Sequence, residues 1–188
     1  MPENKVKFGL KNVHYAVVTE TEGVITYATP VNIPGAVSIS LSAEGEESSF
    51  YADDIKYFNQ FANNGYAGDL EMALIPDDFR VAVLGDVVDD NGVLFENTNG
   101  KTKNFALLFE FNGDANATRH ILYNTSASRP SISSQTKGES LEVQTESLTM
   151  SASAALDTGD VKAKAKVGDS PYETWYTTVY KKTIAAGV

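Results

Sequence analysis

Few side chains in this sequence could serve as the base of a catalytic nucleophile or as soft metal ligands. There are two histidines, His14 and His120, and no cysteine. Nucleophilic catalysis needs a base beside the nucleophile, and neither histidine stands at a metal-ligand spacing from another ligand. Both lie in short runs of apolar residues, so we interpret them as structural side chains of strands.

Acidic side chains are abundant and often adjacent, as at Asp53-Asp54, Asp77-Asp78 and Asp89-Asp90. Paired carboxylates could perform acid–base chemistry, but each pair also suits a turn, a helix start or a solvated surface. The segment from Asp89 begins like a calcium loop, yet Gly100 stands where the bidentate glutamate belongs. The glycine patterns of phosphate-binding and dinucleotide-binding loops are missing. We therefore expect no enzyme activity, no cofactor and no metal.

The chain of 188 residues carries 25 acidic and 15 basic side chains, a formal charge of −10. Such a chain gains little from counterion release on DNA, although its surface would let DNA pass without sticking. The longest apolar runs are far shorter than the roughly 20 residues of a membrane helix. Because Met1–Lys11 is polar and charged, we expect no signal peptide, synthesis in the cytoplasm and no membrane partner.

Alternation of apolar and polar residues predicts a mainly β fold. It is clearest at Ala36–Ser42, Leu148–Ser153 and Val161–Val167, while Phe105–Phe111 is apolar on both faces and should be covered on both. Other predicted strands are Val13–Thr19, Tyr51–Ala62, Gly68–Ile75, His120–Asn124 and Glu173–Tyr180. Apolar spacing in Tyr51–Ala62 also fits a helix, but its aromatic content and the Asn64-Gly65 turn that follows favour a strand. Strands at this spacing, separated by glycine-containing turns, indicate a β-sandwich or partial barrel.

One short helix is predicted near residues 76–84, because Pro76 and two acids suit a first turn and Gly85 suits an end. Asp86–Asn104 predicts a long loop or a mobile hairpin. A change of apolar phase between Leu141 and Leu148 predicts a bulge or kink near Glu146. We divide the chain into an N-terminal arm (1–12), a β-sandwich domain (13–166) and a C-terminal arm or docking strand (167–188).

Three segments have more than one interpretation. Lys162, Lys164 and Lys166 form a stripe that either protects a strand edge or meets an acidic neighbour. The acidic run Glu44–Glu47, followed by Asp53-Asp54, is either a solvated hairpin tip or a negative surface repeated in many copies. The C-terminal segment is too aromatic for a solvated tail, so we expect it to dock on its own sheet or on a neighbour.

An ordered series of segments spanning about residues 7–155 resembles a known family. It comprises Lys7–Ala16, Tyr27–Pro30, Ile33–Leu41, Phe50–Asp54, Asn64–Glu71, Ile75–Phe79 and Val83–Gly85. In this order the segments resemble the major tail proteins, or tail tube proteins, of long, flexible-tailed phages of Gram-positive bacteria. The likeness is a collinear pattern rather than a signature motif.

The resemblance implies a β-sandwich with a flanking helix, whose subunits form hexameric rings that stack into a hollow tube. Four strands of each subunit would line an acidic lumen, and DNA would pass through it without specific binding. The resemblance also implies a place in the virion tail, with the tape measure, tail terminator and tail initiator proteins as partners.

Two hypotheses follow about residues. We expect Val37–Glu47 and Glu139–Ala154 to line the lumen, with the acids Glu44, Glu46, Glu47, Glu142 and Glu146. We expect contacts between rings from Asp89, Asp90, Asn91, Lys101, Trp175, Tyr176 and Tyr180. Deleting Val167–Val188 should then leave a folded monomer that cannot polymerise.

Two other classes of protein remain open. A monomeric β-sandwich binding module could use Trp175, Tyr176 and Tyr180 as an aromatic groove. A tube protein of a contractile tail or a secretion system would share the same architecture, and fold alone would not separate it from a flexible-tailed phage.

Overall fold

A computed structural model describes residues 3–136 and 143–183 of the chain. Its strands are β1 (Lys7–Thr21), β2 (Val24–Tyr27), β3 (Val31–Asn32), β4 (Ala36–Glu44), β5 (Glu47–Ala52), β6 (Ile55–Phe61), β7 (Gly65–Met72), β8 (Val87–Val88), β9 (Leu94–Phe95), β10 (Phe105–Gly113), β11 (Thr118–Ala127), β12 (Glu146–Ser153) and β13 (Lys162–Lys166). A short helix, α1 (Asp77–Phe79), continues as a π-helical turn, η1 (Arg80–Leu84). The predicted mainly β class with one short helix is confirmed, and Gly85 ends the helix in the left-handed conformation.

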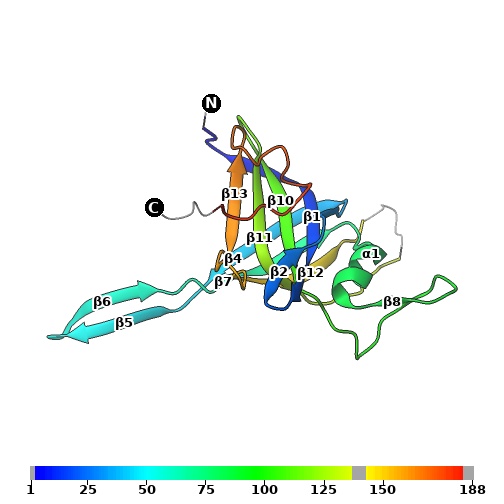
Figure 1. The fold of residues 1–188 in the computed structure, drawn as a ribbon, viewed down its shortest axis with the longest axis horizontal. Helices are drawn as coiled ribbons and strands as arrows, with labels where there is room; N and C mark the ends of the chain where they lie inside the picture. The colour runs from blue at the N-terminus through cyan, green and yellow to red at the C-terminus, as the bar shows by residue number, and fades with distance from the viewer. Residues whose placement is uncertain (1–2, 137–142, 184–188) are drawn as a thin grey trace.

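Nine strands form one antiparallel sheet in the order β2-β1-β10-β11-β12-β7-β4, with β13 added beside β11 and β3 beside β1. Strand β11 is shared along its length, because its first half pairs with β13 and its second half with β12. The sheet therefore curls, and β4, β7 and β12 cross behind β1, β10 and β11 (Figure 1).

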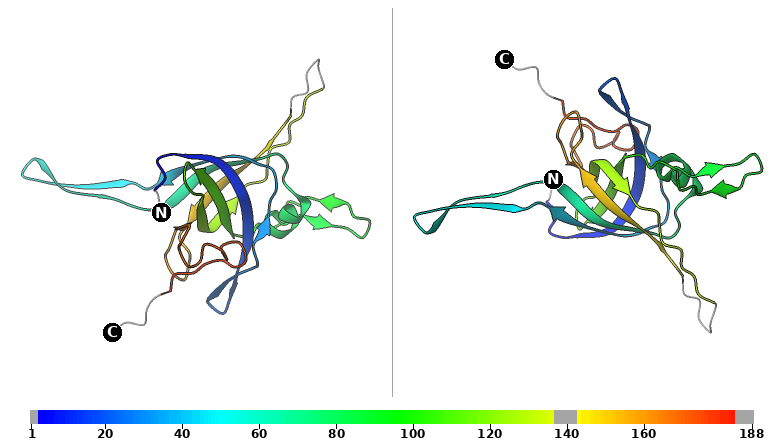
Figure 2. Two further views of the ribbon diagram at one scale, coloured as in Figure 1. Left: turned by 90° about the horizontal axis from the view of Figure 1, so that it is seen from above. Right: turned by 90° about the horizontal axis from the view of Figure 1, so that it is seen from below.

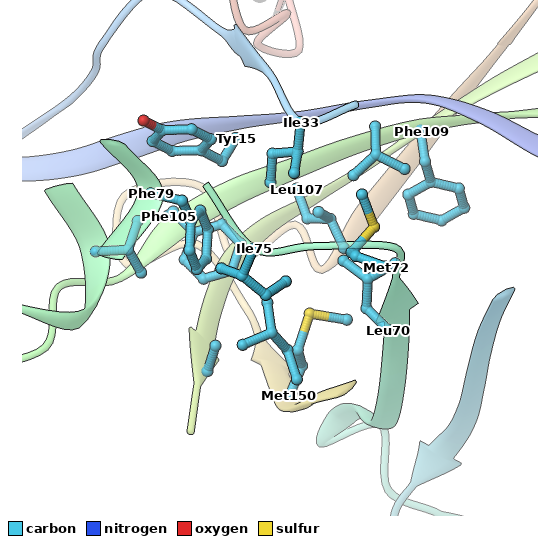
Figure 3. Close-up of a cluster of buried hydrophobic side chains, with 14 of the residues drawn as sticks. Tyr15, Ile33, Leu70, Met72, Ile75, Phe79, Phe105, Leu107, Phe109 and Met150 are labelled. Carbon is cyan, nitrogen blue, oxygen red and sulfur yellow. The ribbon is translucent and has the colours of Figure 1, made fainter. Parts of the chain in front are cut away.

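The main core fills the space inside this curl. Odd-numbered residues of β10, such as Phe105 and Leu107, meet Leu70 of β7 and Leu148 of β12 in one buried cluster. Figure 3 shows these side chains converging with Phe79 of α1, whose ring meets Phe105 edge-on at 5.5 Å. The short helix thus closes one end of the core.

A second buried cluster lies on the opposite face of β1, β10 and β11. It contains Ala106, Leu108 and Ile121, and it is covered by Tyr172 and Trp175 from the C-terminal segment. The prediction that both faces of Phe105–Phe111 are covered is confirmed over Phe105–Glu110, where every residue is buried. Burial on both faces explains why β10 has no polar alternation.

The C-terminal segment is not a strand, so the prediction of one at Glu173–Tyr180 is wrong. Residues 167–177 form successive turns that cross the outer face of the sheet. The Trp175 indole N–H donates to the carbonyl of His120 at 3.2 Å, and the Tyr123 hydroxyl donates to the carbonyl of Tyr180 at 2.8 Å. Neither hydrogen bond is part of a strand ladder. The aromatic content of the segment led to the wrong strand prediction.

A single strand over Tyr51–Ala62 is also wrong, because that range holds most of a hairpin. Strands β5 and β6 pair antiparallel around a two-residue turn, Asp53-Asp54. Both turn residues have positive φ, 50° and 60°, as this kind of tight hairpin requires. Aspartate tolerates the left-handed region, so the turn forms without glycine.

Strand boundaries at two places differ from expectation. Strand β1 starts at Lys7, so Lys7–Asn12 of the expected N-terminal arm pairs with β10, through register shifts at Gly9 and Asn12. No bulge occurs near Glu146; β12 begins there and pairs with β7 in unbroken register. Residue Leu141, on which the change of phase was based, lies outside the described residues.

Candidate assembly surfaces

One face of β4, β7 and β12 is polar and open to solvent, while the other face packs on the core. The open face carries Ser38, Ser40, Ser42 and Glu44 of β4, Asp69 and Glu71 of β7, and Ser147, Thr149 and Ser151 of β12. Strict alternation produces it, because the intervening residues, such as Leu70 and Leu148, point inward. We call this surface the acidic sheet face.

Hydroxyl groups hold the two central carboxylates of the acidic sheet face in place. Thr145 and Ser38 donate to Glu71 at 2.6 and 2.8 Å, and Thr149 donates to Asp69 at 2.8 Å. The hydrogen bond from Thr145, followed by that from Ser38, lowers the pKa of Glu71. The Glu71 carboxylate therefore keeps its negative charge to a lower pH than a free glutamate does.

The five acids expected along the lumen do not share one position. Glu44 belongs to the acidic sheet face, at the end of β4. Glu46 and Glu47 are exposed at the base of the β5–β6 hairpin, where Glu47 pairs with Lys56. Glu142 lies outside the described residues.

Glu146 lies on the opposite side of the sheet from the acidic sheet face. It pairs in register with Met72, on the core side of the sheet. Its carboxylate accepts the Ile75 backbone N–H at 2.6 Å and an Arg80 guanidinium N–H at 3.2 Å. Its contacts therefore fix the helix on the sheet. Asp69 and Glu71 were not selected from the sequence, because neither lies in a run of acidic residues. The alternation around Leu70 could have predicted that both side chains lie on the solvent face of the sheet.

The β5–β6 hairpin projects far from the body of the molecule (Figure 1). Its backbone continues the β4–β7 ladder, since Ala62 donates to Glu46 and Asn64 to Glu44. Its large apolar side chains are between 54% and 71% exposed: Phe50, Tyr51, Ile55, Tyr57, Phe58 and Phe61. A two-stranded hairpin is marginal in water, and this one has no cover within the described part of the chain.

The β8–β9 segment forms a second, smaller projection beside α1 (Figure 2). Asp89 shapes its turn by accepting the backbone N–H groups of Asn91 and Val93 at 2.9 and 2.8 Å. These bonds, with that from Val93 the largest cause, lower the pKa of Asp89. Asp90, Asn91 and Lys101, three of the residues expected to contact another ring, are exposed.

The aromatic residues expected between rings lie largely within the subunit. Trp175 is only 2% exposed, so its ring is not available to a neighbour. Tyr176 is half-buried and stacks on His14 with ring centroids 4.4 Å apart. Tyr180 stacks on Trp175 and keeps about a third of its surface exposed. Burial of Trp175 also removes the centre of the aromatic groove that a binding module would use.

An ion-pair cluster fastens this C-terminal segment. Glu110, 2% exposed, accepts from Arg119 at 2.9 Å and lies 3.1 Å from the Lys11 ammonium. Arg119 in turn covers the Tyr172 ring at 3.8 Å and donates to the Tyr172 carbonyl. Burial alone would raise the pKa of Glu110, but its two basic partners outweigh burial and lower it.

Both histidines make contacts typical of structural side chains. The His14 ring nitrogen contacts the Asn12 carbonyl at 2.9 Å, and the His120 ring packs between Phe109 and Phe111. Over residues 3–136 and 143–183, no three acidic or histidine side chains are grouped to hold a metal. No helix in these ranges is both long and apolar enough to cross a membrane.

Compared with known proteins, the sequence matches no protein family and no curated protein.

Proposed function

We propose that this chain is the structural subunit of the tail tube of a long, flexible-tailed phage. It assembles into hexameric rings that stack into a hollow conduit for DNA, and it works with the tape measure, tail initiator and tail terminator proteins. The resemblance of residues 7–155 to major tail proteins supports the assignment to a flexible-tailed phage. The arrangement of surfaces supports self-assembly.

The observation that carries self-assembly is the projecting β5–β6 hairpin. Burying six large apolar side chains would contribute roughly 1.5–3 kcal/mol each when complete, so their exposure is costly for a free monomer. Both strands expose aromatic residues, so the hairpin offers more than one side to a partner. A second copy of the chain is the partner that a tube requires.

The acidic sheet face supports the proposed conduit. It is broad, polar and negative, with Glu44, Asp69 and Glu71 on three-stranded backbone. A negative wall repels DNA and keeps it sliding, whereas a basic wall would bind phosphate. We place this face toward the lumen, with Asp69 and Glu71 in the positions first given to Glu142 and Glu146.

Negative-stain electron microscopy of the purified full chain over a concentration series tests this function. We expect hollow tubes or six-fold rings above a threshold concentration. The double variant Phe50→Ala/Phe58→Ala removes a cross-strand aromatic pair of the hairpin and should stay monomeric. Val24→Ala, which truncates an equally exposed side chain on the β1–β2 hairpin, is the matched control and should assemble normally.

Strictly monomeric particles at every concentration would contradict self-assembly by the chain itself. Tubes formed equally well by the double variant would remove the hairpin from the interface. A reconstruction that places Asp69 and Glu71 on the outer wall would reverse the proposed orientation of the sheet.

A further inference from the structure

A basic groove of about 580 Å³ opens beside the N-terminal segment, between residues 3–7, the ends of β10 and β11, and β13. Four lysines line it: Lys5, Lys7, Lys164 and Lys166. The rings of Phe111 and His120 line it as well, with centroids 5.2 Å apart. The groove therefore combines a positive border with an aromatic surface, in a chain whose net charge is −10.

The positive charge of this groove is poorly neutralised by the subunit. Lys166 lies 4.0 Å from Glu3, at the limit of an ion pair. Within the described ranges, Lys5, Lys7 and Lys164 have no carboxylate within that distance. Asp114, in the turn between β10 and β11, accepts the Lys5 backbone N–H at 2.8 Å.

His120 lies in the field of these lysines. Burial, followed by the charges of Lys162, Lys164 and Lys7, lowers the pKa of its imidazole to about 4. The surrounding lysine charges thus disfavour a further positive charge at His120.

The tip of the β5–β6 hairpin has the complementary chemistry. Asp53 and Asp54 form its turn, are fully in solvent and make no ion pair among the described residues. Tyr51 and Ile55 flank them and are 64% and 60% exposed. The tip therefore presents two carboxylates between apolar side chains, where the groove presents lysines around aromatic rings.

The tip cannot reach the groove of its own subunit. Strands of six and seven residues carry it about 20 Å out from the β4–β7 ladder. Figures 1 and 2 show the hairpin pointing away from the body, whereas the groove lies by the N-terminus and β13. Any tip in this groove must belong to another copy.

We propose that the basic groove binds the Asp53-Asp54 tip of the β5–β6 hairpin of a second copy of this chain. The inference rests on the proposed self-assembly and names the two surfaces that meet. The contact is head-to-tail, so repeating it generates a ring or an open stack rather than a closed pair. It also gives the stripe of Lys162, Lys164 and Lys166 an acidic neighbour.

A charge-exchange experiment on the full chain tests the proposal. One variant carries Asp53→Lys/Asp54→Lys, and the other carries Lys164→Glu/Lys166→Glu. Each alone places like charges against each other, so we expect the concentration for half-assembly to rise by at least about tenfold in sedimentation velocity. Mixed in equal amounts, the two variants restore opposite charges at every tip and groove, and assembly should return.

Matched controls change the same number of charges elsewhere. Glu20→Lys/Glu22→Lys alters exposed residues at the β1–β2 turn, where Glu22 also has positive φ, and Lys103→Glu/Lys182→Glu alters two exposed lysines that do not line the groove. Both should assemble as the unaltered chain does. Far-ultraviolet circular dichroism and urea midpoints establish that every variant is folded.

The outcomes separate this proposal from the function on which it rests. If both charge variants assemble like the unaltered chain, or if the mixture fails to recover, the tip–groove contact is wrong while self-assembly stands. If the unaltered chain itself never assembles, both proposals fail. Recovery confined to the mixture supports the contact, because no general change of net charge produces it.

Discussion

Truncation of the single tryptophan tests whether the C-terminal segment belongs to the core of the subunit. Trp175 is 2% exposed, packs in the cluster with Leu108 and Ile121, and donates its indole N–H to the His120 carbonyl. Trp175→Ala removes these contacts and leaves that carbonyl without its donor. The segment bearing Tyr172 and Tyr180 also loses its largest anchor.

The expected loss is large compared with the stability of a domain. Replacing a buried tryptophan by alanine costs about 3–5 kcal/mol, including the cavity. The range already includes the lost stacking between Trp175 and Tyr180, whose ring centroids are 6.0 Å apart. Against a total stability of about 5–15 kcal/mol, we expect a partly unfolded population at low urea concentrations.

Urea unfolding below the assembly threshold, followed by far-ultraviolet circular dichroism, measures this loss. Dichroism is needed because the variant has no tryptophan fluorescence. Tyr57→Ala is the matched control, since its ring is 71% exposed on the hairpin, and it should change stability by less than about 0.5 kcal/mol. Equal urea midpoints for Trp175→Ala and the unaltered chain would show that the segment is not packed on the sheet in solution.

The same reasoning changes the expected result of removing residues 167–188. The sequence alone predicted that this truncation would leave a folded monomer that cannot polymerise, because the segment was expected to contact another ring. Because Tyr172 and Trp175 cover the face containing Ala106 and Leu108, truncation should expose that face and destabilise the subunit by more than Trp175→Ala alone. Loss of tubes in that truncation would therefore not identify a contact between rings.

Two further predictions concern pH and backbone. The pKa of His120 is about 4 in the folded chain and about 6.5 when unfolded, so the unfolded state takes up the proton first and stability is lost as pH falls from 6.5 toward 4. His120→Gln should remove about 2 kcal/mol of the fall in stability between pH 7 and 4.5, measured by urea unfolding; parallel pH profiles would contradict the assignment. Gly65 has φ of +110° and a Cβ there would lie 1.9 Å from the Ala152 carbonyl oxygen, so Gly65→Ala should lower stability by at least about 1–3 kcal/mol. Gly23→Ala, with φ of +80° and open space around it, should cost less, and equal losses would show that the close approach is unimportant.

Alternation of apolar and polar residues predicted most of the sheet, because the same pattern indicates a strand and shows which of its side chains point to the core. Ser38, Ser40 and Ser42 alternate with Ile39 and Leu41, and the structure separates them into solvent and core as expected. The helix was predicted equally well, since Pro76 and Gly85 mark its ends by chemistry that does not depend on the rest of the fold.

Predictions failed where partners distant in sequence decide the structure. The role of Glu146 in holding the helix was not predicted, because it depends on Arg80 and the Ile75 backbone, 66 and 71 residues away. The C-terminal segment was expected to dock on its own sheet or on a neighbour, but that Trp175 covers the face of β10 and β11 was not predicted. Neither relationship leaves a local pattern, so no reading of neighbouring residues could have shown it.

The projecting hairpin shows how local pattern and assembly can conflict. Aromatic content in Tyr51–Ala62 favoured a buried strand, yet these aromatic side chains are exposed in the subunit. Apolar periodicity encodes burial without specifying whether the covering surface belongs to the same chain. The lysine stripe of β13 is a similar case for charge. Among the described residues, Glu3 is its one carboxylate partner, 4.0 Å from Lys166. Considered together, a hydrophobic element without cover and a basic groove without an anion are surfaces that a second copy can satisfy simultaneously.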